Sequence, residues 1–319
     1  MDVATNIKWT IESIKKMINM PLFTLIKTSR EILEKNFPRN EIQLSALFNA
    51  KSGACSENCA FCSQSIKWNT NAAKTKLCSA DEVRKAAKKA KAAGASRLCF
   101  AAAWRGLQDR NVKQVVDIIK AIKEEGLTSC ASLGLLSEDK AKALKDAGLD
   151  FYNHNIESSK NYYAKMVTTH TFEDRISTVN NASKAGLKVC CGGIIGMGES
   201  IDDRIEMLAE LANMNPQPKS VPINILNPIK GTPVANKYKP IDSFDIIRVI
   251  ATARMLMPKS YIRLSAGREF MGKELQAMCL FSGANSIFYG DKLLTTPNAN
   301  PMNDIDLINQ LDIKVEKIN

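Results

Sequence analysis

The chain has 319 residues, of which 45% are hydrophobic, and a formal net charge of +11 from 44 Lys and Arg against 33 Asp and Glu. No apolar run reaches the roughly 18 residues that span a membrane, so we expect no membrane association. The lysines are spread over predicted helix faces rather than gathered in a tail, and only 6% of residues are aromatic, which disfavours nucleic-acid binding.

The cysteine content indicates the cellular compartment. Nine cysteines, an odd number, argue against a disulfide framework. The first 20 residues include Asp2 and Glu12 and lack the apolar core and small-residue cleavage site of a secretory signal. We therefore expect a reducing compartment, with the cytoplasm as the default location.

The predicted elements alternate between strands and helices along most of the chain. Residues 1–40 are predicted to form a helical extension. The predicted strands are 42–48, 97–103, 128–134, 151–157, 188–196, 221–227, 261–267 and 286–290. Between the first two, Ser79 and Glu82 form a capping box that begins a helix, and Gly94 ends it. In the next helix one face carries Val112, Val115, Val116, Ile119 and Ile122.

This alternation predicts the fold class. Strands that alternate with helices imply a parallel sheet, and eight such units over about 250 residues have the size of a closed barrel. We therefore predict an α/β protein with a (β/α)8 barrel of the TIM type over residues 41–319, including a short C-terminal extension. Because no linker rich in Pro, Gly or Ser divides the chain, we expect a single domain.

A loop after the first strand holds three cysteines, Cys55, Cys59 and Cys62, in a C-x3-C-x2-C spacing. Structural zinc sites use four ligands, so zinc would need a fourth, such as Cys78. Three thiolates suit a four-iron cluster in which one iron keeps a position without a protein ligand. The loop lies at the end of the barrel where active sites occur, which favours chemistry over a structural role.

Three further cysteines occupy equivalent positions near the starts of three strands. Cys99, Cys130 and Cys190 each follow a helix-ending glycine by four or five residues. If each points inward, they converge on one volume inside the barrel and predict a second metal or cluster site. The alternative is that cysteine fills the core as a small apolar residue. We assign that structural role to Cys78, Cys191 and Cys279.

Two stretches suggest a binding site for a polar ligand. The predicted strand at 151–157 places Asn153, Asn155 and Glu157 on one face and His154 on the other, although a buried core network would look the same. In GGIIGMGE (192–199), glycines would allow a ligand to approach the backbone closely, or they would form a structural turn. The sequence has only two histidines, which excludes a His-rich zinc hydrolase. It also has no H-E-x-x-H, G-x-S-x-G or P-loop motif, so the enzyme classes that these motifs identify are excluded.

The motifs together resemble a known family. CSENCAFC (55–62) is similar to the signature of the radical S-adenosylmethionine enzymes, and the chain from about residue 8 to 300 resembles the biotin synthases. The stretches that carry the resemblance are CSENCAFCSQS, RLCFAAAWR, YNHNIE, KVCCGGIIGMGE, VPINIL, IRLSAGRE and ANSIFYGDKLLTT.

The resemblance implies specific site residues. It implies that Cys55, Cys59 and Cys62 hold a [4Fe–4S] cluster that binds S-adenosylmethionine at its open iron. The cofactor-contacting residues that it implies are Phe61 beside the adenine, Asn155, Glu157, Gly192, Gly193, Ile194 and Glu199. It implies a second, [2Fe–2S] cluster on Cys99, Cys130, Cys190 and Arg263, with Arg97 close to it, and substrate contacts from Asn155 and Asn224. Ligation by Arg263 rests on the resemblance alone, since a guanidinium is normally a cation that forms ion pairs. Glu157 stands where the family more often has an aspartate, which moves its carboxylate by one methylene.

The implied reaction is insertion of sulfur into dethiobiotin to form biotin, with a 5′-deoxyadenosyl radical abstracting hydrogen and the second cluster as the sulfur donor. The chemistry would be carried by the clusters and S-adenosylmethionine, without a protein acid or base. The implied partners are a low-potential electron donor of the flavodoxin or ferredoxin type, iron–sulfur assembly machinery and a second copy of the chain. The alternatives are another radical S-adenosylmethionine barrel enzyme, such as one for cofactor maturation, or a noncatalytic zinc or iron–sulfur protein.

Overall fold

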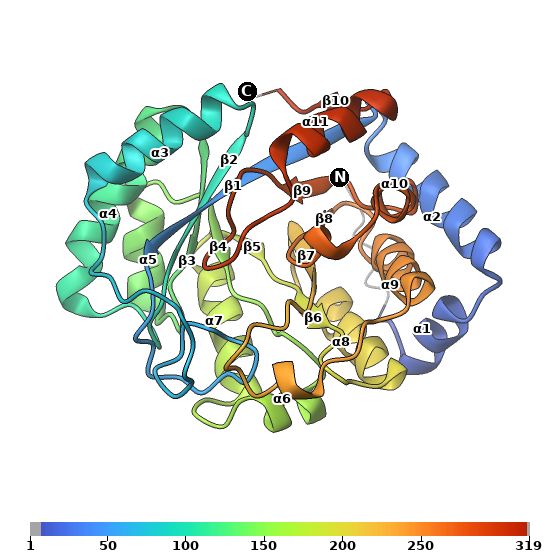
Figure 1. Ribbon diagram of the computed structural model, residues 1–319, viewed down its shortest axis with the longest axis horizontal. Helices are drawn as coiled ribbons and strands as arrows, with labels where there is room; N and C mark the ends of the chain where they lie inside the picture. The colour runs from blue at the N-terminus through green and yellow to red at the C-terminus, as the bar shows by residue number, and fades with distance from the viewer. Residues whose placement is uncertain (1–7, 318–319) are drawn as a thin grey trace.

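The computed structural model describes residues 8–317, in which parallel strands form a closed barrel surrounded by helices (Figure 1). The barrel strands are β1 (Glu41–Lys51), β2 (Arg97–Ala102), β3 (Thr128–Ser132), β4 (Phe151–Asn153), β5 (Lys188–Cys190), β7 (Ser220–Ile225), β8 (Tyr261–Leu264) and β9 (Ser286–Phe288). They pair in that order, and β9 pairs with β1 to close the barrel. The predicted fold class and all the predicted strands are confirmed.

Two predicted strands differ in their details. The fifth strand breaks at Cys191 and Gly192 and continues as β6 (Gly193–Ile195), which pairs with β7. The fourth strand, predicted to reach residue 157, ends at Asn153, yet its backbone still bonds to the fifth strand through His154 N–H to Cys190 O and Ile156 N–H to Gly192 O, both 3.0 Å. The break therefore bends both strands without separating them.

A layer of helices covers the barrel. These helices are α3 (Ala80–Ala92), α4 (Asp109–Glu124), α5 (Glu138–Asp146), α6 (Lys160–Met166), α7 (Phe172–Lys184), α8 (Ile201–Asn213), α9 (Ser243–Leu256) and α10 (Lys273–Phe281), with 3-10 turns η1 (Ala235–Lys237) and η2 (Arg268–Phe270). Helix α4 buries Val115, Ile119 and Ile122 as predicted, but Ile118 is also buried while Val112 and Val116 are only partly so. Within the described residues, no helix has the length and apolar character needed to cross a membrane.

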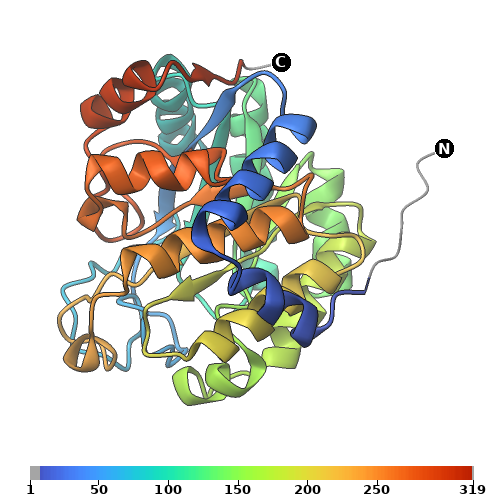
Figure 2. The same ribbon diagram turned by 90° about the vertical axis from the view of Figure 1, so that its right-hand side faces the viewer.

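The two ends of the chain add elements outside the barrel. Helices α1 (Ile11–Ile18) and α2 (Leu22–Asn36) lie against α8 and α9 (Figure 2), where Arg248 donates to the carbonyls of Ile18 and Met20 at 2.8 Å. The predicted N-terminal helices are thus present, although residues 1–7 of that prediction lie outside the described residues. At the other end, α11 (Pro301–Gln310) leads into β10 (Lys314–Val315), which pairs with the first residues of β1.

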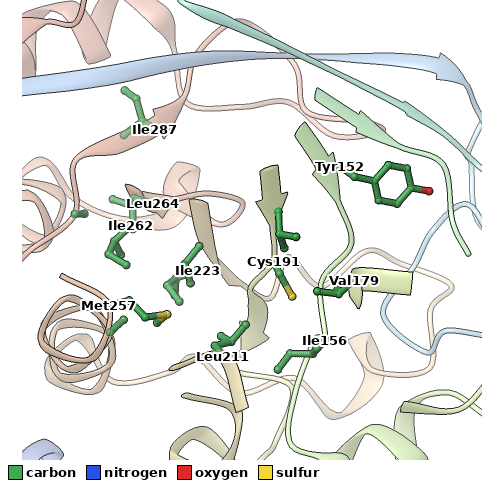
Figure 3. Close-up of a cluster of buried hydrophobic side chains, with 14 of the residues drawn as sticks. Tyr152, Ile156, Val179, Cys191, Leu211, Ile223, Met257, Ile262, Leu264 and Ile287 are labelled. Carbon is green, nitrogen blue, oxygen red and sulfur yellow. The ribbon is translucent and has the colours of Figure 1, made fainter. Parts of the chain in front are cut away.

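The core lies between the barrel and its helices, because side chains alternate across each strand. On β7, Val221 and Ile223 are fully buried, and Ile223 packs in the same apolar cluster as Leu211 and Met257 (Figure 3). The intervening Pro222 and Asn224 line a cavity inside the barrel. The strand therefore holds the helix layer with one face and builds a polar interior with the other.

Removing the cap of α3 should destabilise the protein. The Ser79 hydroxyl accepts from Glu82 N–H at 3.3 Å, and the Glu82 carboxylate accepts from Ser79 N–H at 2.8 Å. Ser79→Ala should lower the free energy of unfolding by about 1 kcal/mol, measured by urea titration with circular dichroism. Ser137→Ala is the matched control, because Ser137 occupies the N-cap of α5 without a side-chain cap bond. Equal losses in the two variants would contradict this account of the cap.

Candidate functional site

A cavity of about 250 Å³ opens among the segments that follow the strands and extends into the barrel. Its walls include Leu293–Thr296, which follow β9, and residues 225–227, at the end of β7. The predicted site residues that line it are Phe61, Cys62, Cys99, Cys130, Asn155, Glu157, Ile194, Asn224 and Arg263. One cavity thus joins part of the cysteine loop to the cysteines of the barrel interior.

The cysteine loop is folded tightly upon itself. Gly53 has a φ of +65°, and a Cβ there would lie 2.5 Å from Ala73 O, so the turn into the loop requires glycine. Cys55 N–H donates to Gln64 O, and Cys62 N–H donates to Cys59 O, both at 3.0 Å. Burial raises the pKa of Cys55, and raises that of Cys59 to about 12. Burial therefore favours the protonated thiols in this loop, and binding of a metal would have to displace their protons.

A buried polar network anchors this loop, and sequence reasoning missed it. Glu57, between Cys55 and Cys59, hydrogen-bonds His170, whose other ring nitrogen lies 2.8 Å from the Tyr163 hydroxyl. Burial alone would raise the pKa of Glu57, but the Thr169 hydroxyl, His170 and Arg105 together lower it. The network continues through Arg175, whose Nε donates to the Tyr163 hydroxyl at 2.7 Å. Glu57 is far from the other residues of this network in the sequence, and no sequence pattern connects them.

Arg175 connects the network to the polar wall of the cavity. It donates to Asn155 O at 2.7 Å and lies 3.4 Å from one carboxylate oxygen of Glu157. The other oxygen, Glu157 Oε2, is buried and has no hydrogen-bond partner among the described residues, and burial raises the pKa of this carboxyl group. Because buried polar atoms are normally paired, this acceptor fits a ligand hydroxyl in the cavity. Glu157 also has a φ of +69°, an uncommon backbone conformation for a non-glycine residue.

Amide side chains complete the polar wall. Asn155 Oδ1 accepts from Gly192 N–H at 3.1 Å, and Asn224 donates to Gly193 O at 3.0 Å. Asn153 donates to the sulfur of Cys190 at 3.2 Å. His154 is buried on the other side of the strand and does not line the cavity, as the alternation predicts. The amides are therefore held in fixed orientations by the bent fifth strand.

The glycine segment packs closely against neighbouring parts of the chain. A Cβ on Gly192 would lie 2.0 Å from Pro222 O, and one on Gly193 would lie 2.3 Å from the Met207 sulfur. These glycines allow neighbouring chain segments to pack, and only Ile194 of the segment lines the cavity. Glu199 lies elsewhere, because its carboxylate accepts from the N–H groups of Gly196 and Met197 and pairs with Arg204 at 2.7 Å.

The inner cysteines lie together, as predicted. Strand register places Cys99 directly opposite Cys130, and Asn153 opposite Cys190. The three thiols form one buried cluster with Phe151. A hydrogen bond from Cys130 lowers the pKa of Cys190 well below that of an ordinary thiol, and Arg263 and Arg97 act in the same direction. The same hydrogen bonds raise the pKa of Cys130 well above that of an ordinary thiol. The trio therefore combines two sulfurs that favour the thiolate with one protonated thiol, which would lose its proton on binding a metal.

Two arginines are buried beside these thiols. Arg263 is fully buried and bonds to neutral groups: Ser286 Oγ at 2.9 Å, Ser45 Oγ at 3.0 Å and Gln43 Oε1 at 3.1 Å, with Cys190 Sγ at 3.8 Å. Arg97 stacks 3.7 Å from the Phe151 ring centroid, and its buried Nε and Nη1 have no partner among the described residues. Neither guanidinium pairs with a carboxylate there. Two buried cations without a carboxylate partner, beside three cysteine sulfurs, fit a negatively charged group bound to those sulfurs.

The remaining cysteines have structural surroundings. Cys191 and Cys279 are fully buried in the main apolar cluster, and Cys78 packs against it (Figure 3 shows Cys191). Among residues 8–317, no group of three or more His, Cys, Asp or Glu side chains is arranged to hold a single metal ion. The metal-ligand roles of the two cysteine sets therefore stay predictions, supported by the burial and charge around them.

Stability should fall in mild acid because both histidines are buried and neutral. Burial lowers the pKa of His154 well below its usual value, and lowers that of His170. Below about pH 6.5 the unfolded chain binds protons that the folded chain does not, so stability present above that pH is lost as the pH falls. His154→Phe should reduce the loss between pH 7 and pH 5 by roughly 1–2 kcal/mol in urea titrations.

Tyr152→Phe is the matched control for this measurement. The Tyr152 ring lies 6.5 Å from the His154 ring, and its hydroxyl donates to Gly134 O at 2.7 Å, but it does not titrate between pH 5 and 7. This variant should keep the parent's dependence on pH. If the parent and His154→Phe lose the same stability on acidification, His154 is not neutral in the folded protein.

Comparison with family models and curated proteins gives consistent matches. The model of the radical SAM superfamily matches residues 50–212, and that of the Biotin and Thiamin Synthesis associated domain matches residues 222–314. Biotin synthase of Ehrlichia chaffeensis is 50% identical, covering 99% of this chain and 98% of its own. Biotin synthase of Anaplasma marginale (strain Florida) is 53% identical, covering 96% of this chain and 94% of its own.

Solved structures share the fold at low identity. Methylornithine synthase superposes with a TM-score of 0.78 at 19% identity, covering 98% of this chain and 95% of its own. The FeFe-hydrogenase maturase HydG from Carboxydothermus hydrogenoformans gives a TM-score of 0.79 at 17% identity, covering 96% of this chain and 75% of its own. At these identities the likeness concerns the barrel alone.

Proposed function

Because this chain belongs to the biotin synthase family of radical S-adenosylmethionine enzymes, we propose that it inserts sulfur into dethiobiotin to form biotin. The observation that carries the proposal is the single cavity that reaches from Cys62 on the loop to Cys99, Cys130 and Arg263 inside the barrel. A reaction that needs a radical source and a sulfur source requires both to face one substrate.

The part of the cavity next to the cysteine loop suits S-adenosylmethionine beside a [4Fe–4S] cluster. Cys55, Cys59 and Cys62 would hold the cluster, with Glu57 and His170 fixing the loop between them. Phe61 packs with Ile194 and Met197 into an apolar wall that suits an adenine ring. The unpaired oxygen of Glu157 would accept from a ribose hydroxyl, although the extra methylene relative to aspartate moves it.

The part of the cavity inside the barrel suits a [2Fe–2S] cluster on Cys99, Cys130 and Cys190. Arg97 and Arg263 would supply the positive charge that balances thiolates and sulfides, and the serine and glutamine bonds hold the Arg263 guanidinium in place. When bound, the [4Fe–4S] cluster would supply the electron for reductive cleavage of S-adenosylmethionine, and the [2Fe–2S] cluster would supply the sulfur that enters the product.

The residues of the chain itself would bind and orient the reactants and would exclude water from them. Asn155 and Asn224, fixed by the backbone of Gly192 and Gly193, would orient the substrate and the nucleoside between the two cysteine sets. Leu293, Leu294 and residues 225–227 enclose the cavity, which limits side reactions of a radical with water. No protein acid or base is required, because unactivated C–H bonds have no proton-transfer route.

Further parts of the proposal concern partners and location. A low-potential electron donor of the flavodoxin or ferredoxin type and iron–sulfur assembly machinery would serve the clusters, and the chain would act as a homodimer. A reducing compartment, the cytoplasm, suits nine cysteines that are all free within the described residues.

Product formation tests the proposal directly. Anaerobically reconstituted protein, given dethiobiotin, S-adenosylmethionine and a strong reductant, should yield biotin by mass spectrometry. Cys59→Ala should yield neither biotin nor 5′-deoxyadenosine, whereas Cys279→Ala, at a buried cysteine far from the cavity lining, should retain both. Unchanged 5′-deoxyadenosine formation by Cys59→Ala would show that the loop does not carry the cleavage.

Iron content and Mössbauer spectra test the inner site independently of turnover. The parent protein should show two cluster types, and Cys99→Ala should lose the smaller one while keeping the larger. Cys191→Ala is the control, because this buried neighbour of Cys190 belongs to the apolar core. A single cluster type in the parent would overturn the assignment of two clusters.

A further inference from the structure

Two segments beside the cysteine loop carry positive charge without any acidic residue. Residues 63–78, which follow the loop, and residues 226–240, which follow β7, contain no Asp or Glu. Their lysines are all exposed: Lys67, Lys74, Lys76, Lys230, Lys237 and Lys239. We call these two segments, with their six lysines, the basic rim.

The two segments form one continuous surface with the cysteine loop. A Cβ on Gly231 would lie 2.0 Å from Asn69 O, so the segments touch backbone to backbone. Val234 N–H donates to Ala60 O, inside the cysteine motif, at 3.4 Å. Both views show the light-blue and light-orange loops side by side at one end of the barrel (Figures 1 and 2).

The charge of the basic rim is not neutralised locally. No lysine of the rim forms an ion pair within residues 8–317, whereas lysines on the helices, such as Lys89 and Lys123, pair with Asp291 and Asp150. The acidic groups next to the rim include Glu57, which is buried in its network, Glu269, which accepts from Asn227 at 2.7 Å, and Asp242, which accepts from Phe244 N–H at the start of α9. The rim therefore presents a concentrated positive field to solvent.

Apolar groups lie within the basic rim and next to a predicted cluster ligand. Ile66, next to Lys67, is 55% exposed. Trp68 is partly buried, and its indole N–H donates to Cys59 O at 2.9 Å. An apolar centre with a charged border is the composition of a protein docking surface. A partner seated here would be separated from Cys59 by a single side chain.

We propose that the basic rim docks an acidic, low-potential electron-donor protein of the flavodoxin type. This inference rests on the proposed function, which consumes one electron for each S-adenosylmethionine cleaved. The donor is oxidised by one electron, and the sulfonium is reduced as its carbon–sulfur bond breaks, so no proton or leaving group crosses the interface. The chemistry of the rim favours a protein over a nucleic acid, because it contains lysine but no arginine, and its Trp68 is held by a hydrogen bond instead of being free to stack on bases.

Charge reversal tests the basic rim with a matched control. The test variant is Lys67→Glu, Lys74→Glu and Lys230→Glu. The control variant, Lys113→Glu, Lys120→Glu and Lys142→Glu, changes the net charge equally at exposed positions on α4 and α5. Surface plasmon resonance should show flavodoxin binding by the reconstituted parent that weakens with salt, and the test variant should weaken it by about tenfold or more. The control variant should bind within about twofold of the parent.

A neutral small reductant separates this inference from the proposed function. With photoreduced 5-deazaflavin in place of flavodoxin, parent and test variant should form 5′-deoxyadenosine at equal rates, while with flavodoxin the test variant should be slower. Equal flavodoxin affinity in parent and test variant, or loss of activity with deazaflavin as well, overturns the docking surface. Binding of single-stranded RNA that depends on the rim, with flavodoxin affinity unaltered, also overturns it. Absence of product from the parent with deazaflavin instead contradicts the proposed function.

Discussion

Closure of the parallel barrel is the constraint on which the rest of the structure depends. Backbone pairing fixes which residues of neighbouring strands stand opposite each other, and a slip by one residue would turn every side chain to the other face. In this register Cys99 meets Cys130, and Arg263 meets Ser286. The positions of the helices are also constrained, because residues on the outer face of the strands, such as Ile223, pack against them. A polar interior is therefore held rigidly by an apolar exterior.

Much of the fold could be predicted from local patterns. The strands and the cap at Ser79 have short-range signals, namely apolar runs that end at turns and a capping box. The break at Cys191 and Gly192 could not be predicted, because Gly192 lies close to Pro222, a residue 30 positions away, and no local pattern indicates that contact. The pairing of β10 with β1 was equally hidden, since two residues are too few to show a period.

The functional site likewise contains residues that sequence patterns could predict and residues that they could not. Cys99, Cys130 and Cys190 could be grouped because equivalent positions in successive units face one interior. The bonds that hold Arg263, and the contacts from Glu57 to His170 and onward to Arg175, join distant segments through side chains, for which a single sequence has no pattern. For the glycines at 192 and 193, the sequence left close ligand approach and a structural role open, and the structure shows close packing against Pro222 and Met207. Sequence patterns thus located the site more reliably than they explained each residue in it.

The buried guanidinium groups of Arg97 and Arg263, neither of which pairs with a carboxylate among the described residues, affect the folding of the newly made chain. Like charges repel strongly where water is excluded, so the polypeptide completes its barrel around a centre that resists closing. Any anion that settles there contributes its binding energy to folding itself. Chains that do not receive a cluster would then unfold more often, and cellular proteases would degrade them preferentially.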